Sequence, residues 1–125
     1  GEAILLAVDR MEMAVEALLH GAAKVQTASC NPGGCLFVHG ALSTGTESEA
    51  LRQELIARRG AGENTIRERL ERAQTEGDLP ASVNPADLAR FVVTVIHGMA
   101  VQAASGATLA DLERVIDLAM GAWPA

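Results

Sequence analysis

The chain has 125 residues, of which 49% are hydrophobic and 21% are charged, and its net charge is −6. This length and composition predict a single folded domain over residues 1–125 and exclude a disordered chain. The acidic balance excludes a free-standing nucleic-acid binder, because contact with phosphate backbones needs a basic surface. Alanine and leucine abound, whereas the chain has two Phe, one Trp and no Tyr, so helices are favoured over strands.

Two cysteines, Cys30 and Cys35, are too few for a disulfide framework, and no Cys/His spacing matches a zinc site. No basic neighbour indicates an activated thiol, which favours structural thiols over a redox pair. No apolar run approaches the roughly 18 residues that span a bilayer, and Glu2, Asp9 and Arg10 interrupt the first apolar stretch. We therefore expect a soluble cytoplasmic protein without a metal, a cofactor or a membrane partner.

The first predicted element is a helix over about residues 3–25, whose apolar positions are Leu6, Met13, Leu18 and Val25. It is apolar on more than one side, which indicates burial between neighbours. Turn residues at 31–34 separate it from a short predicted helix over about residues 35–43, which carries no permanent charge. A helix of this kind is usually central to its fold, so we expect it to line the interior.

A long helix is predicted over about residues 47–76, with Thr46 and Glu49 in capping-box spacing and Gly77 as its C-cap. An apolar stripe recurs along it at helical period, through Leu51, Leu55, Gly62, Ile66, Leu70 and Ala73. Seven of the ten basic residues lie between Arg52 and Arg90, interspersed with glutamates. This mixture predicts a solvated helix face rather than a surface for DNA.

Two further helices are predicted near the C-terminus, joined by a short turn at Gly106. The first runs from Asn84, the N-cap, through Pro85 at the first helical position to about residue 104. The second runs from Thr108, which has capping-box spacing with Asp111, to about residue 123. The fold is therefore predicted to be all-α, with five helices and no sheet.

Both of these last helices are more apolar than one core-facing stripe requires, and no residue from 91 to 104 is permanently charged. Monomers rarely expose so much apolar surface, so we expect a homodimer in which two hairpins form a four-helix bundle. Gly98 and Ala100 would allow close helix approach, and Ile116→Glu is expected to give a monomer or an aggregate. The residues assigned to the dimer interface are Phe91, Val92, Ile96, Met99, Leu112, Ile116, Ala119, Met120 and Trp123.

Four segments follow one another along the chain: GCLFVHGAL at residues 34–42, ERAQTEGDLP at 71–80, NPADLARF at 84–91 and VIHGMAV at 95–101. In this order and spacing they resemble segments of the TetR family of transcriptional regulators, which often read GCLLVNAAL, ERARAEGELP, DPEALARFL and LLQGLRVLAR. The resemblance covers about residues 34–120. It departs from the family at His39, where Asn is frequent, and at His97, where Gln is frequent.

The resemblance implies the effector-binding and dimerisation domain of a ligand-responsive transcriptional repressor. Nothing before Gly1 could enter a major groove, so we expect contact with DNA only through a helix-turn-helix domain missing from this chain. No nucleophile elbow, P-loop or dinucleotide fingerprint points to an enzyme. The alternative is a stand-alone helical dimerisation protein without a small-molecule ligand.

The resemblance also places a ligand among the helices around residues 35–43, where the uncharged walls suit an apolar small-molecule effector. His39 would supply one orienting polar group, and few polar groups are typical of such sites. The residues assigned to the ligand site are Met13, Phe37, His39, Ile66 and Val95. The plainer alternative is a filled core, in which Phe37 and the methionines pack together and His39 and His97 are hydrogen-bonded packing residues.

Overall fold

The computed structural model describes residues 10–28 and 49–124, and from 49 to 59 mainly the backbone. The described ranges are helical and contain no strand, which confirms the predicted all-α class. The helices are α2 (Met11–Thr27), α4 (Glu49–Thr75), α5 (Pro85–Ala104) and α6 (Leu109–Gly121). The predicted helix at residues 35–43, and with it the count of five, lies outside the described residues.

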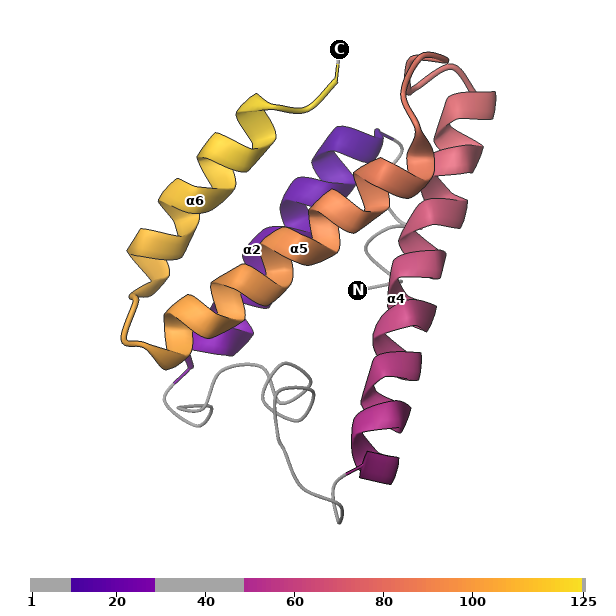
Figure 1. Ribbon diagram of the computed structural model, residues 1–125. Helices are drawn as coiled ribbons and strands as arrows, with labels where there is room; N and C mark the ends of the chain where they lie inside the picture. Colours follow the sequence, from indigo (N-terminus) through magenta and orange to yellow (C-terminus); the bar gives the residue numbers. More distant parts are fainter. Residues whose placement is uncertain (1–9, 29–48, 125) are drawn as a thin grey trace.

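The helices α2 and α5 lie side by side in the middle of the described fold (Figure 1), with α4 on one side and α6 on the other. Although α6 follows α5 along the chain, it packs more extensively against α2 than against α5. The α5–α6 hairpin is therefore held together largely through α2.

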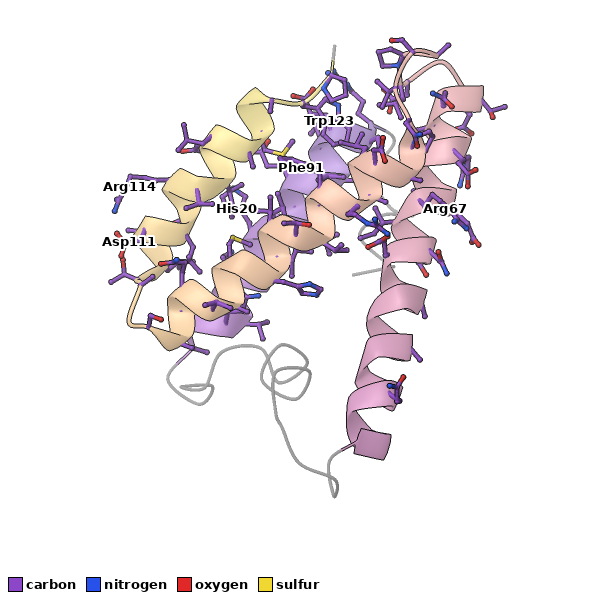
Figure 2. All side chains as sticks on the ribbon, viewed as in Figure 1. His20, Arg67, Phe91, Asp111, Arg114 and Trp123 are labelled. Atoms are coloured by element: carbon purple, nitrogen blue, oxygen red, sulfur yellow. The ribbon has the colours of Figure 1, made fainter. Side chains whose placement is uncertain are left out.

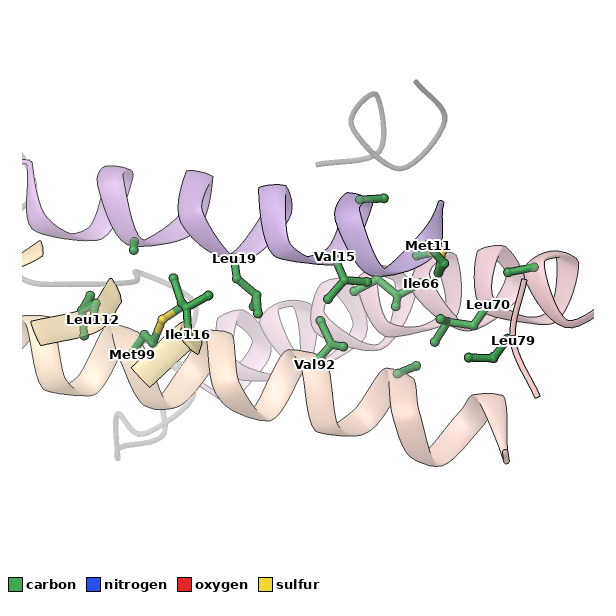
Figure 3. Packing of buried hydrophobic residues seen from close by; sticks show 14 residues of the cluster. Met11, Val15, Leu19, Ile66, Leu70, Leu79, Val92, Met99, Leu112 and Ile116 are labelled. Carbon is green, nitrogen blue, oxygen red and sulfur yellow. The ribbon is translucent and has the colours of Figure 1, made fainter. Parts of the chain in front are cut away.

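A continuous hydrophobic core runs along the inner side of α2 (Figure 3). At one end, Ile66, Leu70 and Leu79 surround Met11 at the beginning of α2. At the other end, Met99 of α5 lies with Leu112 and Ile116 of α6, all three buried. Both the α4 end and the α6 end of the fold are therefore built on the same two central helices.

The buried face of α2 differs from the predicted one. Met13 is 57% exposed and Val25 is also exposed, whereas the buried residues of α2 are Met11, Ala14, Val15, Leu19, Ala23 and Gln26. The small side chains of Ala14 and Ala23 lie at this face, where they allow close approach by neighbouring helices. Apolar residues on several sides of α2 had left the orientation open, and packing against α5 and α6 selects the face with the alanines.

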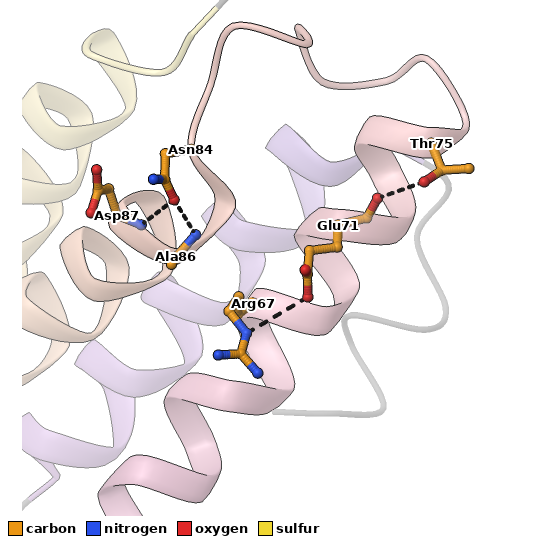
Figure 4. A network of polar contacts seen from close by, with 6 residues as sticks. All are labelled: Arg67, Glu71, Thr75, Asn84, Ala86 and Asp87. Carbon is orange, nitrogen blue, oxygen red and sulfur yellow. Dashed lines mark hydrogen bonds and ion pairs between the residues drawn. The ribbon is translucent and has the colours of Figure 1, made fainter.

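The predicted apolar stripe of α4 is confirmed from Ile66 onward, whereas Gly62, which was also assigned to it, is exposed. Ile66, Leu70 and Ala73 of the predicted stripe are buried. On the outer side, the guanidinium of Arg67 lies 3.6 Å from the Glu71 carboxylate (Figure 4), and Arg72 and Glu76 form an equivalent pair at 3.1 Å. These exposed ion pairs confirm the predicted solvated face, on which acidic groups offset the basic ones.

The predicted N-terminal caps of α5 and α6 are confirmed. The Asn84 side-chain oxygen accepts hydrogen bonds from the backbone N–H groups of Ala86 at 2.9 Å and Asp87 at 3.2 Å (Figure 4). Thr108 and Asp111 form a reciprocal capping box at the start of α6. The helix α6 ends at Gly121, two residues before the predicted limit, because Pro124 disfavours a helical conformation at the preceding residue.

Candidate functional site

The α5–α6 hairpin presents an apolar surface on the side away from α2, which we call the outer face. Its members recur at helical spacing along each helix: Phe91, Val95, Gly98 and Gln102 on α5, and Asp111, Val115 and Leu118 on α6. The exposed fractions are 40% for Phe91, 40% for Val115 and 79% for Leu118. Large apolar side chains are thus exposed on both helices of the hairpin.

A groove of about 350 Å³ opens between α5 and α6 on this face. It is lined by Val95, Gly98, Met99, Gln102, Ala107, Asp111, Leu112 and Val115. The groove exists because α6 packs more extensively against α2 than against α5, so the space between α5 and α6 is not filled by side chains. Its volume is at the lower end of the range that binds small molecules, and its lining is largely apolar.

The charged groups of the outer face lie near the hairpin turn (Figure 2). Asp111 forms an exposed ion pair with Arg114, on the same helix. Hydrogen bonds from the Thr108 backbone N–H and hydroxyl, together with the charge of Arg114, lower the pKa of the Asp111 carboxyl. Phe91 and Trp123 lie at the other end of the hairpin, so the outer face is polar at its turn and aromatic at its open end.

Four of the predicted interface residues are core residues of this chain instead. Val92, Met99, Leu112 and Ile116 are all buried, because α2 packs against the inner sides of α5 and α6. These side chains therefore pack within the chain itself. The substitution Ile116→Glu would disrupt the core of the chain and would not test an interface between two chains. Of the remaining assigned residues, Phe91 is exposed, and the half-buried ones are Ile96, Ala119, Met120 and Trp123.

The residues assigned to the ligand site are not brought together within the described part of the chain. Ile66 is buried in the core, Val95 lines the groove between α5 and α6, and the exposed Met13 does not face an interior. Phe37 and His39 lie outside the described residues. The described groove is therefore a different place from the predicted ligand site, with Val95 as the shared residue.

Gln26 is a buried polar residue that the sequence analysis did not single out. Its side chain is 6% exposed, and its amide nitrogen donates a hydrogen bond to the Ile96 carbonyl oxygen at 3.1 Å. Its amide oxygen is also buried and accepts no hydrogen bond from the residues that the structure describes. Because the Ile96 carbonyl can only accept, the amide orientation is determined and the free atom is the acceptor. The signal was a glutamine seven residues after Leu19, in the apolar register of α2.

His20 connects α2 to α6 (Figure 2). Its ring nitrogens lie 3.9 Å from Glu16 on the same helix and 3.9 Å from Glu113 on α6. Across residues 10–28 and 49–124, no group of three or more His, Cys, Asp or Glu side chains is arranged to hold a metal ion. None of the described helices is long and apolar enough to cross a membrane.

Several known proteins are similar to this chain in sequence or in structure. The HTH-type transcriptional repressor ComR of Escherichia coli K12 is 26% identical over 98 residues, which cover 78% of this chain and 47% of ComR. A cysteine mutant of the TetR family transcriptional regulator CifR, complexed with 26-bp double-strand operator DNA, is 36% identical, with a TM-score of 0.91. That match covers 98% of this chain and 64% of the CifR chain.

A protein of Rhodococcus sp. RHA1 named as a TetR transcriptional regulator is 31% identical, with a TM-score of 0.83 over 98% of this chain and 65% of that one. The chain thus spans about half to two thirds of the relatives that it matches. The family model for the tetracyclin repressor-like C-terminal domain matches residues 7–119. The chain therefore belongs to the TetR family of transcriptional regulators, as a C-terminal domain of the tetracyclin repressor-like type.

Proposed function

We propose that this chain is the effector-binding and dimerisation part of a ligand-responsive transcriptional repressor. The relatives that support this proposal are named as a repressor and as a regulator complexed with operator DNA. Each extends well beyond the segment that matches this chain. Because the chain is acidic and Arg67 and Arg72 on α4 are paired with glutamates, contact with an operator is assigned to the part of the regulator outside these residues.

The outer face of the α5–α6 hairpin is the observation that carries the dimerisation part of the proposal. Phe91, Val115 and Leu118 expose apolar surface on both sides of an apolar groove. A second copy, related by a two-fold axis, would present the same surface and complete a four-helix bundle. In that arrangement Leu118, the most exposed large apolar side chain described, is the natural residue to enter the partner's groove.

The effector is proposed to be a largely apolar small molecule that carries a hydrogen-bond donor. Gln26 supports the donor, since a buried amide oxygen without a partner costs about 1–3 kcal/mol that a hydroxyl or N–H group would recover. Phe37 and His39 stay predicted members of the site. The effector would act by binding one arrangement of the dimer more tightly than another and shifting their populations.

Native mass spectrometry of the purified chain tests both parts together. We expect a species at twice the chain mass of 13.0 kDa, and an additional small mass where effector is retained. A single species at 13.0 kDa, unchanged up to concentrations of about 100 μM, where most stable homodimers are assembled, would contradict the dimer.

The donor requirement is tested by thermal shift with a panel of apolar alcohols and the methyl ethers of the same skeletons. We expect the alcohols to raise the melting temperature more than the ethers, and Gln26→Leu to remove this difference while keeping the core filled. Equal responses to both series, in the native chain and in Gln26→Leu, would contradict an acceptor role for Gln26.

A further inference from the structure

The helix α2 begins without a cap of its own. Its N-cap residue, Arg10, makes no side-chain hydrogen bond to the first turn. Instead the backbone N–H of Met11 donates to a carboxylate oxygen of Asp78 at 2.6 Å, across a separation of 67 residues. A carboxylate at a helix N-terminus satisfies a free N–H group and interacts favourably with the helix dipole. The start of α2 is thus stabilised by the loop between α4 and α5.

The position of Asp78 is set by the end of α4. Gly77 has a φ of +85°, and its N–H donates to the Gln74 carbonyl at 3.2 Å. The N–H of Asp78 donates to the Ala73 carbonyl at 2.8 Å. These two bonds form a Schellman motif, which ends α4 and turns the chain in a defined direction. The carboxylate that caps α2 therefore moves with the last turn of α4.

The side chain of Gln74 holds the rest of the same loop. Its amide nitrogen donates to the Pro80 carbonyl oxygen at 2.9 Å and to the Val83 carbonyl oxygen at 2.8 Å. Between them, Leu79 is buried in the core. Both of these hydrogen bonds go to the loop, so Gln74 holds in place the segment from which Asp78 reaches α2.

We propose that Gln74 and Asp78 form a loop clamp that couples the C-terminal end of α4 to the beginning of α2. If α4 shifts or rotates, the Asp78 carboxylate shifts with it, and the first turn of α2 must follow or lose its cap. The coupling itself is a property of the fold, and its use to transmit an effector signal rests on the proposed regulator function.

Hydrogen exchange of the full chain, measured by mass spectrometry or NMR, tests the clamp. We expect Asp78→Ala to speed exchange of the hydrogen-bonded Met11 and Ala14 amides by about tenfold, the effect of losing one charge-assisted hydrogen bond. Gln74→Ala should speed the same amides, although the hydrogen bonds that it removes go to Pro80 and Val83 and not to α2. The control is Thr75→Ala, whose hydroxyl bonds only to the Glu71 carbonyl within α4.

The double variant separates a coupled clamp from two independent contacts. We expect Gln74→Ala to add little in the background of Asp78→Ala, because both changes release the same cap. If Gln74→Ala speeds exchange only within the loop at residues 76–83, or if the two effects on α2 add, the clamp is overturned. Asp78→Asn, which keeps an acceptor oxygen, should give a smaller effect than Asp78→Ala and serves if the alanine variant does not fold. These readouts need no effector, so they stand or fall separately from the regulator function.

Discussion

The α5–α6 hairpin has two apolar faces with different surroundings. On the inner face, Val92, Met99 and Ile116 are buried against α2 and the core. On the outer face, Phe91 and Leu118 are exposed although they are equally apolar. The difference shows that apolar residues form both the core and a candidate interface. The position of α2 decides which residues are buried in the core and which are exposed. A substitution should therefore act on folding when it falls on the inner face and on association when it falls on the outer one.

The largest expected effect comes from a charge on the inner face. Ile116→Glu places an unpaired carboxylate where the native side chain is fully buried, and we expect a loss of stability of about 4 kcal/mol or more. That is a large fraction of the free energy of unfolding of an ordinary domain, which is about 5–15 kcal/mol. Urea denaturation followed by circular dichroism measures it. An Ile116→Glu chain that is as stable as the native chain would show that the inner face is not core.

Matched truncations give the next largest difference between the two faces. Met99→Ala should cost about 2–5 kcal/mol, because it leaves a cavity between α2, α5 and α6. Val115→Ala, on the outer face of α6, should cost less than about 1 kcal/mol. Denaturation at low protein concentration, where association does not contribute, compares the two. Equal losses would remove the distinction between the faces.

The sequence predicted the helix ends of the hairpin well because caps are local. Asn84 and the Thr108–Asp111 pair satisfy N–H groups two or three residues away, so their spacing is readable without a structure. The start of α2 shows the opposite case, since its cap comes from Asp78. No local pattern at Arg10 or Met11 could have indicated a partner 67 residues away.

The orientation of the helices could not be predicted for the same reason. A helix that is apolar on several sides has no single apolar face that must point to the core. The sequence alone therefore could not tell that Val92 is buried and Phe91 exposed, or that Ala14 is buried and Met13 exposed. Those assignments depend on which helices pack against one another, and here α6 packs mainly against α2. Gln26 was readable in principle, as a polar residue in the apolar register of α2, but its unpaired oxygen depends on the Ile96 carbonyl of α5.

A smaller effect is expected at the start of the hairpin. Asn84→Ala removes two hydrogen bonds from the first turn of α5 and should cost about 1 kcal/mol. Thr94→Ala is the matched control, because the Thr94 hydroxyl bonds only to the Arg90 carbonyl one turn earlier. Because α5 contributes to both faces of the hairpin, the lost cap should lower the stability of both. If Asn84→Ala melts at the native temperature, the cap contributes nothing measurable.

The smallest expected effect is the acid dependence of the capping box at α6. Hydrogen bonds from Thr108 lower the pKa of Asp111 below its ordinary value of 3.8. Its contribution is therefore present above about pH 4, the unfolded value, and is lost as pH falls through the lower folded value. Between pH 4 and pH 2 the native chain should lose more stability than Asp111→Asn. Parallel acid titrations of the two chains would contradict this link.

The proposed interface is tested most directly by sedimentation velocity of two matched variants. Leu118→Lys and Met13→Lys each place a charge at an exposed apolar position of a helix, the first on the outer face and the second on α2. A dimer formed through the outer face predicts that the native chain and Met13→Lys sediment as dimers, whereas Leu118→Lys sediments as a folded monomer. A dimer that survives Leu118→Lys unchanged, or one that is lost equally in both variants, would contradict the outer face as the dimer interface.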